Sequence, residues 1–386
     1  MIILGIETSC DETAAAVLSF DKAQDKQKRI IILSNVVASS AKLQAKYGGV
    51  IPEQAAREQL KTIIPVIEEA LNQAFPKKRL PRAAFGRPRN DEIGIDAIAV
   101  TFGPGLIGSL LVGVETAKTL ARIWDKPLIP VNHLLGHFYA NWIVPSSFRV
   151  ISEESSFSSW KIASSSFDKL RTPRNDNFEV PSFPCLGLLV SGGHTDLVLF
   201  SNHGKYKYLG GTRDDACGEC FDKCARLLGL PYPGGPYLSK LAEKGDSSKF
   251  NLPIPMRGSK DLDFSYSGLK TAVANIIQKS KIKNQNEKAD LAAAIEETII
   301  ISLIEKVILA IKKYKVEQIM VAGGVAANQK LVRDLRLKIK DLRIKLHVPP
   351  PYLCTDNGAM IAAAGFFTKP ISNPLSLQAD PNLSLL

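Results

Sequence analysis

The distribution of apolar and polar residues predicts an α/β protein built from two similar halves. Each half opens with two short apolar runs around a polar turn, the pattern of a β-hairpin: 2–6 with 14–19, and 185–190 with 197–200. The first turn is Glu7-Thr8-Ser9-Cys10-Asp11-Glu12-Thr13, and the second is Ser191-Gly192-Gly193-His194-Thr195-Asp196. The same device therefore begins each half of the chain.

The segments after each hairpin alternate between helical and extended patterns. Helical periodicity covers 52–75, 109–124, 238–243, 268–278, 289–314 and 328–342, and strands are predicted at 95–100 and 316–322. This plan resembles the actin-like ATPase (ASKHA) fold that actin, heat-shock chaperone ATPases and sugar kinases share. It implies two duplicated lobes with a central nucleotide cleft. Short Gly, Ser and Thr residues in the hairpin turns let backbone N–H groups approach phosphate oxygens.

The predicted domains are an N-terminal actin-like lobe at 1–140, a Ser-rich insertion or linker at 141–183, and a C-terminal actin-like lobe at 184–386. A C-terminal helix that packs back on the first lobe is an open alternative. The basic segment from Lys77 to Arg89 holds six Lys or Arg residues, and it fits a solvated linker or an RNA-contacting patch equally well.

Composition narrows the class of protein. The chain has 386 residues, of which 45% are hydrophobic and 23% charged, and this balance excludes disordered, collagen-like and coiled-coil proteins. The formal net charge of +11 is compatible with a polyanionic partner such as nucleic acid. Six cysteines without regular spacing do not form a disulfide framework. Neither a signal or transit peptide nor a membrane span is predicted, and we expect a cytoplasmic protein.

Two histidines suggest a metal site. His133 and His137 are four residues apart, a spacing that places both imidazoles on one face of a helix, although such a pair also occurs as ordinary core or surface histidines. Leu134 follows His133, so the glutamate that a zincin protease needs beside its first histidine is missing. Asp356 is the best third ligand, and its alternative role is that of a helix N-cap.

Other motifs carry less chemistry. Gly103-Pro104-Gly105-Leu106-Ile107-Gly108 matches a dinucleotide-binding pattern, but no acidic residue follows at the required place, and a tight turn from strand to helix is favoured. No P-loop motif occurs. Cys217, Cys220 and Cys224 fit a small apolar stripe on a helix better than a metal site, because no fourth ligand lies nearby. On the same helix, Asp222 is better placed to meet a ligand.

Ten motifs in order, from Glu7 to Met360, resemble the tRNA N6-adenosine threonylcarbamoyltransferase family (TsaD type, formerly an endopeptidase family). They are 7–13, 48–53, 103–106, 132–137, 190–195, 214–223, 232–236, 263–271, 323–328 and 354–360. The resemblance implies transfer of a threonylcarbamoyl group from threonylcarbamoyl-AMP to N6 of the adenosine at tRNA position 37, next to the anticodon. The tRNAs are those that read codons beginning with A.

The resemblance also implies the ligands. His133, His137 and Asp356 would hold one divalent metal, with iron (Fe²⁺) favoured over zinc. The adenylate would be bound by Val190, Ser191, Gly192, Gly193, His194, Asp222, Gly235 and Asn328. The hairpin backbone would lie at the phosphate, Asp222 and the glycine turn near the ribose, and Asn328 near the base. We further hypothesise that Asp11 or Glu12 accepts the proton of the attacking amine or orients the tRNA base.

The implied partners are tRNA, a degenerate paralogue that forms a heterodimer with this family, and a separate P-loop ATPase. A metalloprotease, a non-catalytic scaffold, and a small-molecule kinase or carbamoyltransferase of the same fold are the alternatives. The chain departs from the family at Gln59, where members typically carry His, and in the length of the Ser-rich segment after Trp142.

Overall fold

The computed structural model of the protein describes residues 1–22, 28–76, 94–144, 179–280, 282 and 284–386. The basic segment at 77–89 and most of the Ser-rich segment lie outside the described residues. The chain divides into two compact units, which are Met1–Val180 with Asp356–Leu386, and Pro181–Thr355. Each unit carries one five-stranded sheet.

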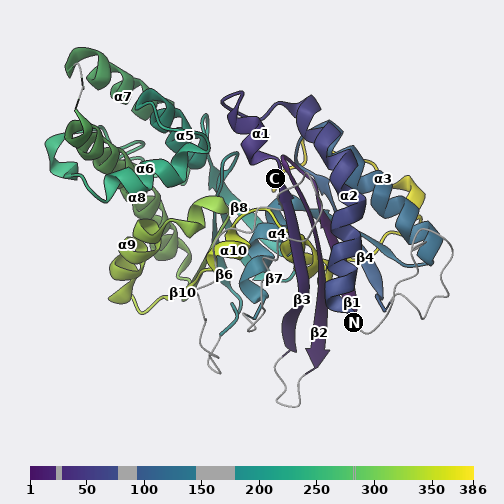
Figure 1. Cartoon of the computed structure of the whole chain (residues 1–386). Coiled ribbons are helices and arrows are strands. Elements are labelled where there is room, and N and C mark those ends of the chain that lie inside the picture. Colours follow the sequence, from purple (N-terminus) through teal and green to yellow (C-terminus); the bar gives the residue numbers. More distant parts are fainter. Residues whose placement is uncertain (23–27, 77–93, 145–178, 281, 283) are drawn as a thin grey trace. The chain divides into compact units, whose positions relative to one another are not determined.

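The first unit is built on a mixed sheet of order β3-β2-β1-β4-β5. Its strands are β1 (Ile2–Glu7), β2 (Glu12–Lys22), β3 (Lys28–Ser39), β4 (Ala97–Gly103) and β5 (Leu128–Asn132). Its helices are α1 (Ala41–Ala45), α2 (Pro52–Ala74), α3 (Ile107–Trp124), α4 (His133–Tyr139) and α11 (Gly358–Gly365). Short 3₁₀ turns lie at Ala140–Trp142 and Pro374–Ser376. Figure 1 shows α2 running along the purple strands β1–β3.

The second unit repeats this sheet. Its strands are β6 (Cys185–Val190), β7 (Thr195–Asn202), β8 (Lys205–Gly211), β9 (Gln318–Ala322) and β10 (Lys345–His347). Its helices are α5 (Cys217–Leu227), α6 (Gly234–Ala242), α7 (Ser267–Ser280), α8 (Gln285–Tyr314), α9 (Gln329–Lys340) and α10 (Pro351–Cys354). Two 3₁₀ turns, Ser247–Lys249 and Gly324–Ala327, complete it.

The two sheets have the same topology. In each, the third, second, first, fourth and fifth strands lie side by side in that order. The first three strands are antiparallel, and the first, fourth and fifth are parallel. The prediction of a duplicated α/β protein of the actin-like fold is confirmed, including both hairpins.

The two faces of β1 pack against different partners. Leu4 and Ile6 point into the apolar core that α2 and α3 share with the sheet. Gly5 faces the other way, where a Cβ atom would lie 2.3 Å from the carbonyl oxygen of Gly358. Because side chains alternate along a strand, Glu7 shares the face of Gly5. The end of β1 therefore directs a carboxylate toward the side of the sheet that α11 covers.

Helix α11 belongs to the first unit, although the predicted C-terminal lobe ran from 184 to 386. Its residues from Gly358 to Ala364 are buried, and α11 contacts β1, β2 and β4. A Cβ atom at Gly358 would lie 2.5 Å from the backbone nitrogen of Ala16, so only glycine permits this approach. The lack of bulky side chains lets the helix lie directly on the strands, and this packing explains the observed division of the chain.

Two interpretations of local motifs are confirmed. The Gly103 motif is a turn between β4 and α3, where a Cβ atom at Gly103 would lie 2.0 Å from the carbonyl oxygen of Asp380. The cysteines Cys217, Cys220 and Cys224 are fully buried in the apolar core of the second unit. They are core residues, as their helical spacing indicated.

Candidate metal centre and nucleotide pocket

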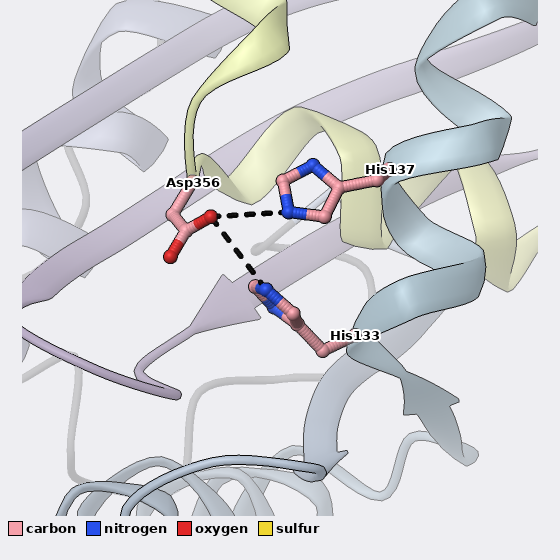
Figure 2. Close-up of side chains that lie close together, drawn as sticks. All are labelled: His133, His137 and Asp356. Carbon is pink, nitrogen blue, oxygen red and sulfur yellow. Dashed lines mark ion pairs between the residues drawn. The ribbon is translucent and has the colours of Figure 1, made fainter. Parts of the chain in front are cut away.

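His133, His137 and Asp356 converge in the first unit (Figure 2). One ligand atom from each of the three lies within 4.8 Å of the other two. Asp356 Oδ1 is 3.2 Å from His137 Nε2 and 3.6 Å from His133 Nε2. Asp356 is more than two hundred positions from the two histidines in the sequence, and the structure brings the three predicted ligands together.

Helix caps explain why the three side chains meet. Asn132 caps α4 by accepting a hydrogen bond from the backbone N–H of Leu134, which starts the helix at His133. Asn357 caps α11 by accepting one from Met360 at 3.0 Å. The alternative interpretation of Asp356 as an N-cap is therefore wrong, because its neighbour fills that role. Asp356 stands one residue before the cap, with its carboxylate toward the histidines (Figure 2).

The donor set fits a transition metal. Ligand atoms about 2.0–2.2 Å from a zinc ion lie roughly 3.0–3.6 Å from one another. The two distances from Asp356 agree with this geometry. The Nδ1 atom of His137 is buried without a hydrogen-bond partner in the described part of the chain, while its Nε2 atom faces Asp356. Two imidazoles and one carboxylate suit iron or zinc and leave coordination positions open.

Glu7 was overlooked as a site residue by sequence reasoning. It is fully buried, and its Oε2 atom lies 3.0 Å from His133 Nδ1. Burial alone would lower the pKa of His133, but the negative charges of Glu7 and Asp356 raise it to about 9. Burial opposes ionisation of Glu7 too, yet the charge and hydrogen bond of His133 hold its pKa below the ordinary value. The pair is thus a carboxylate beside a protonated Nδ1.

Asp11 and Glu12 lie in the turn between β1 and β2, next to this centre. Burial first, and then the charges of Asp11 and Asp356, raise the pKa of Glu12 well above its ordinary value. Glu12 accepts a hydrogen bond from Ser39 Oγ at 3.2 Å. The charge of Asp356 acts on Glu12, so this carboxyl lies within electrostatic reach of the three converging residues.

Gln59 holds the same turn in place. Its side-chain amide donates to the carbonyl oxygens of Glu12 at 2.8 Å, Cys10 at 3.0 Å and Thr8 at 3.4 Å. The side chain is almost completely buried. Gln59 therefore has a structural role here, since an amide nitrogen offers two hydrogens to backbone oxygens of the turn.

The second unit contains a pocket of about 880 Å³. Four residues of the predicted adenylate site line it: Gly192, Asp222, Gly235 and Asn328. The other four, Val190, Ser191, Gly193 and His194, do not line this pocket. Val190 is buried at the end of β6, and Ser191 closes the turn by donating its N–H to the carbonyl of His194. The hairpin thus reaches the pocket through Gly192.

Two of the lining side chains already hold backbone groups. Asp222 Oδ1 accepts the N–H groups of Gly234 at 2.7 Å and Gly235 at 2.9 Å. These bonds satisfy the first turn of α6, so that α6 begins at Gly234 and not at the predicted 238. Asn328 caps α9 through Leu331 and donates to Glu296 Oε1 at 2.7 Å. Both side chains are therefore fixed before a ligand arrives.

Sequence reasoning also overlooked the acidic wall of this pocket. Glu296 and Glu297 line it from α8, and Lys330 lines it from α9. Glu296 is only 5% exposed, and Lys330 forms ion pairs with Glu297 and Asp334. The available signal was a pair of acids within the largely apolar stretch 291–304 of this helix. A charged side chain on the buried face of a helix needs an ion-pair or hydrogen-bond partner, or a ligand.

A two-unit actin-like fold with a metal-type centre and a nucleotide-sized pocket defines the class of protein. The family described as tRNA N6-adenosine threonylcarbamoyltransferase (TsaD) matches residues 31–150 and 171–363. The chain belongs to this family, as predicted, and is thereby an enzyme of the transferase class.

Two relatives agree with this assignment, and a solved structure agrees with the fold. The chain is 43% identical over its whole length to the tRNA N6-adenosine threonylcarbamoyltransferase of Symbiobacterium thermophilum, covering 97% of that protein. It is 43% identical to the enzyme of the same name from Thermomicrobium roseum, over 95% of this chain and 92% of that one. The crystal structure of T. kodakarensis HypF has a similar fold, with a TM-score of 0.52, 12% identity, and coverage of 95% of this chain and 47% of that one.

No helix in the described ranges is both long enough and apolar enough to cross a lipid bilayer.

Proposed function

We propose that the protein transfers the threonylcarbamoyl group of threonylcarbamoyl-AMP to N6 of adenosine 37 in tRNAs that read codons beginning with A. The observation that carries this proposal is the 43% identity to two enzymes of that name over 95% or more of the chain. A tRNA substrate agrees with the net charge of +11 and implies action in the cytoplasm.

The proposed reaction exchanges one bond to the carbamoyl carbon for another. The N6 amine attacks this carbon, a C–N bond forms, the bond from the carbon to the phosphate oxygen breaks, and AMP leaves. One proton is lost from the amine. Because a mixed carbamoyl–phosphate anhydride is already activated, the enzyme chiefly has to position the two substrates and stabilise the developing charge.

The pocket of the second unit is the proposed adenylate site. The hairpin from Val190 to His194 would approach the phosphate through the backbone N–H groups of Gly192 and Gly193, because those of Ser191 and His194 bond within the turn. Asp222 uses Oδ1 for the glycine turn at Gly235, which leaves Oδ2 for a ribose hydroxyl. Asn328 would lie near the base, oriented by its bond to Glu296.

The histidines and Asp356 are the proposed ligands of one divalent metal, with iron favoured over zinc. Such an ion supplies Lewis-acid stabilisation of negative charge on a phosphate or carbamoyl oxygen. His133 and His137 would each present Nε2, and Asp356 would present Oδ1, as their mutual distances suggest. These residues would hold the ion close to Asp11 and Glu12.

Asp11 and Glu12 are the proposed groups that accept the amine proton or orient the tRNA base. A carboxyl whose pKa is raised is a stronger base when it is ionised, and this property suits proton transfer from an amine. Glu12 has such a raised pKa because it is buried beside other carboxylates. Removing its ability to ionise without changing its shape tests the assignment.

The proposed partners follow the family resemblance. We propose that the chain forms a heterodimer with a degenerate paralogue and acts with a separate P-loop ATPase, while another enzyme supplies the adenylate. The purified complex is therefore the material for a functional test.

The decisive experiment supplies threonylcarbamoyl-AMP, labelled in its threonine, and unmodified tRNA to the purified complex. We expect the label at N6 of adenosine 37. A transcript with guanosine at position 37 is the matched control and should stay unlabelled. Metal chelation should abolish transfer, and titration with Fe²⁺ or Zn²⁺ should restore it. Label recovered in free threonine, in a peptide or in another small molecule would contradict the proposal.

A further inference from the structure

Glu7 is a buried carboxylate whose position needs an explanation. It ends β1 after the apolar residues Leu4 and Ile6 and is 0% exposed. Moving an ionised carboxylate out of water is costly unless its oxygens are fully hydrogen-bonded. The hydrogen-bond partners of the two oxygens should therefore indicate the role of this carboxylate.

Both oxygens of Glu7 have polar partners. Oε1 accepts the backbone N–H of Ser9 at 2.5 Å. Oε2 accepts the hydroxyl of Thr101 at 2.5 Å and lies 3.0 Å from His133 Nδ1. Thr101 is itself fully buried on β4, the neighbouring strand. The carboxylate is thus held by the turn after β1 and by β4, and its third contact is with the imidazole of His133.

Two oxygens face Nδ1 of His133, Glu7 Oε2 at 3.0 Å and Ser9 Oγ at 3.2 Å, and the anionic one favours a proton on Nδ1. If Nδ1 carried a lone pair, that pair would face a carboxylate oxygen at 3.0 Å and repel it. With a proton on Nδ1 the contact is a charge-assisted hydrogen bond. Nε2, on the opposite side of the ring, is then the atom that can coordinate, and it faces Asp356.

The two histidines differ in this respect. The Nδ1 atom of His137 is buried and has no hydrogen-bond partner in the parts of the chain that the structure describes. Only His133 has an anionic neighbour behind its ring. The centre therefore contains one imidazole with a carboxylate partner behind its ring, and one whose polar contact is to Asp356 in front.

We propose that Glu7 is a positioning residue for the metal centre. Its carboxylate, held by Ser9 and Thr101, binds the Nδ1 proton of His133 and aims Nε2 at the site shared with His137 and Asp356. This inference rests on the metal site of the proposed function. A ligand histidine whose second nitrogen donates to a carboxylate is a stronger donor, and loss of such a partner typically lowers metal affinity about 10–100-fold.

The test measures metal affinity directly. The complex is stripped of metal and titrated with Zn²⁺ and with Co²⁺, whose visible spectrum reports the coordination. Glu7→Gln keeps the shape and removes the charge, and we expect its affinity to fall about 10–100-fold. Thr101→Val leaves Glu7 in place but removes one of the two partners of Oε2, and a smaller loss is expected. Asp196→Asn is the matched control, a buried and hydrogen-bonded carboxyl of the second unit outside the pocket lining, and it should bind metal like the wild type.

A second measurement uses the wild-type chain and does not depend on a folded variant. Nitrogen-15 NMR of histidine-labelled, zinc-loaded protein should show His133 protonated at Nδ1 and coordinated through Nε2. Unchanged affinity in Glu7→Gln, or a His133 proton on Nε2, overturns the role of Glu7 while leaving the metal site standing. If the wild type binds no metal through these ligands, the metal centre of the proposed function fails as well.

Discussion

The two hairpin turns occupy the same place in two equivalent sheets, yet they offer opposite chemistry. The turn from Thr8 to Glu12 in the first unit gives its carbonyl oxygens to surrounding groups, among them Gln59 and the N–H of Leu106. Two of its side chains, Asp11 and Glu12, are carboxylates. It is an acidic turn fixed from outside.

The turn from Ser191 to His194 is closed on itself. Ser191 donates its N–H to the carbonyl of His194, and Ser191 Oγ accepts the N–H of His194 at 3.1 Å. Between them, the N–H groups of Gly192 and Gly193 make no hydrogen bond within the described residues. A Cβ atom at either glycine would meet nothing within 4 Å. This turn presents free backbone donors in open space, which suits an anion.

The difference teaches that a duplicated fold supplies equivalent positions, and that a few residues decide what each position binds. In the proposed function, the acidic turn works through side chains beside a metal centre, while the glycine turn works through its backbone beside a pocket.

The largest effect is expected for Glu12→Gln. If the acidic turn acts through an ionisable side chain, the rate of threonylcarbamoyl transfer should fall about 10²–10⁴-fold, the usual range for a lost proton-transfer group. The affinity for the adenylate should not change, and equilibrium binding measures it separately. Full transfer by the variant would remove Glu12 from this role.

A methyl group at Gly192 tests the glycine turn. In Gly192→Ala the new Cβ atom meets no protein atom, so the fold should be retained, but it enters the space of the proposed ligand. We expect KM for the adenylate to rise about ten- to a hundredfold, or about 1.4–2.8 kcal/mol, with little change in kcat. Gly268→Ala, at an equally open glycine outside the pocket lining, is the control and should leave KM unchanged.

The pH dependence of binding should differ between the two sites. Metal must displace the extra proton of His133, whose pKa is raised to about 9, so metal affinity should increase about tenfold per pH unit between pH 6.5 and 9. Calorimetry on the stripped protein measures it. Adenylate affinity should stay nearly constant over this range. A metal affinity that is independent of pH would contradict the assigned charge state of His133.

The free energy of unfolding of the metal-free protein should also depend on His133, and it should fall as the pH rises. Because the folded pKa of His133 is higher than the ordinary value of about 6.5, its contribution to the free energy of unfolding is complete below pH 6.5 and is lost as pH rises through 9. Urea unfolding at several pH values measures this decline. The Glu7→Gln variant, which lacks the anionic partner, should show a smaller one.

The smallest effect concerns salt. For a protein that contacts about three phosphates, doubling the salt concentration weakens RNA binding roughly four- to sixfold. We expect tRNA binding to follow such a dependence because of the +11 charge, and adenylate binding to change less. Filter binding at several salt concentrations measures both slopes. A flat response for tRNA would argue against a phosphate-driven interface.

Much of the fold follows from local pattern. Both hairpins, the strands β4 and β9, and helices such as α2 and α8 could be predicted because their apolar residues recur with the period of one structure. The start of α6 could not, since Gly-Gly-Pro ordinarily ends a helix and the compensating bonds come from Asp222 on another helix.

The site was predictable to the same extent. His133 and His137 share a helix, so their spacing is informative, whereas Asp356 and Asn357 are both good caps and only the structure shows which one caps α11. Glu7 belongs to the first family motif, 7–13, but its partner His133 comes more than a hundred residues later. The alternation along β1 was the one clue, since it turns Glu7 away from the apolar core of Leu4 and Ile6.

The place of Asp356 in the chain has a consequence for biosynthesis. This ligand follows His133 by 223 residues, and the whole second unit is made in between. At about 5–20 residues per second, translation takes roughly 10–45 s to travel from one to the other. During that interval the nascent histidine pair lacks its acidic partner, so we expect ion loading to come late, after the sheet of the first unit has received its last helix.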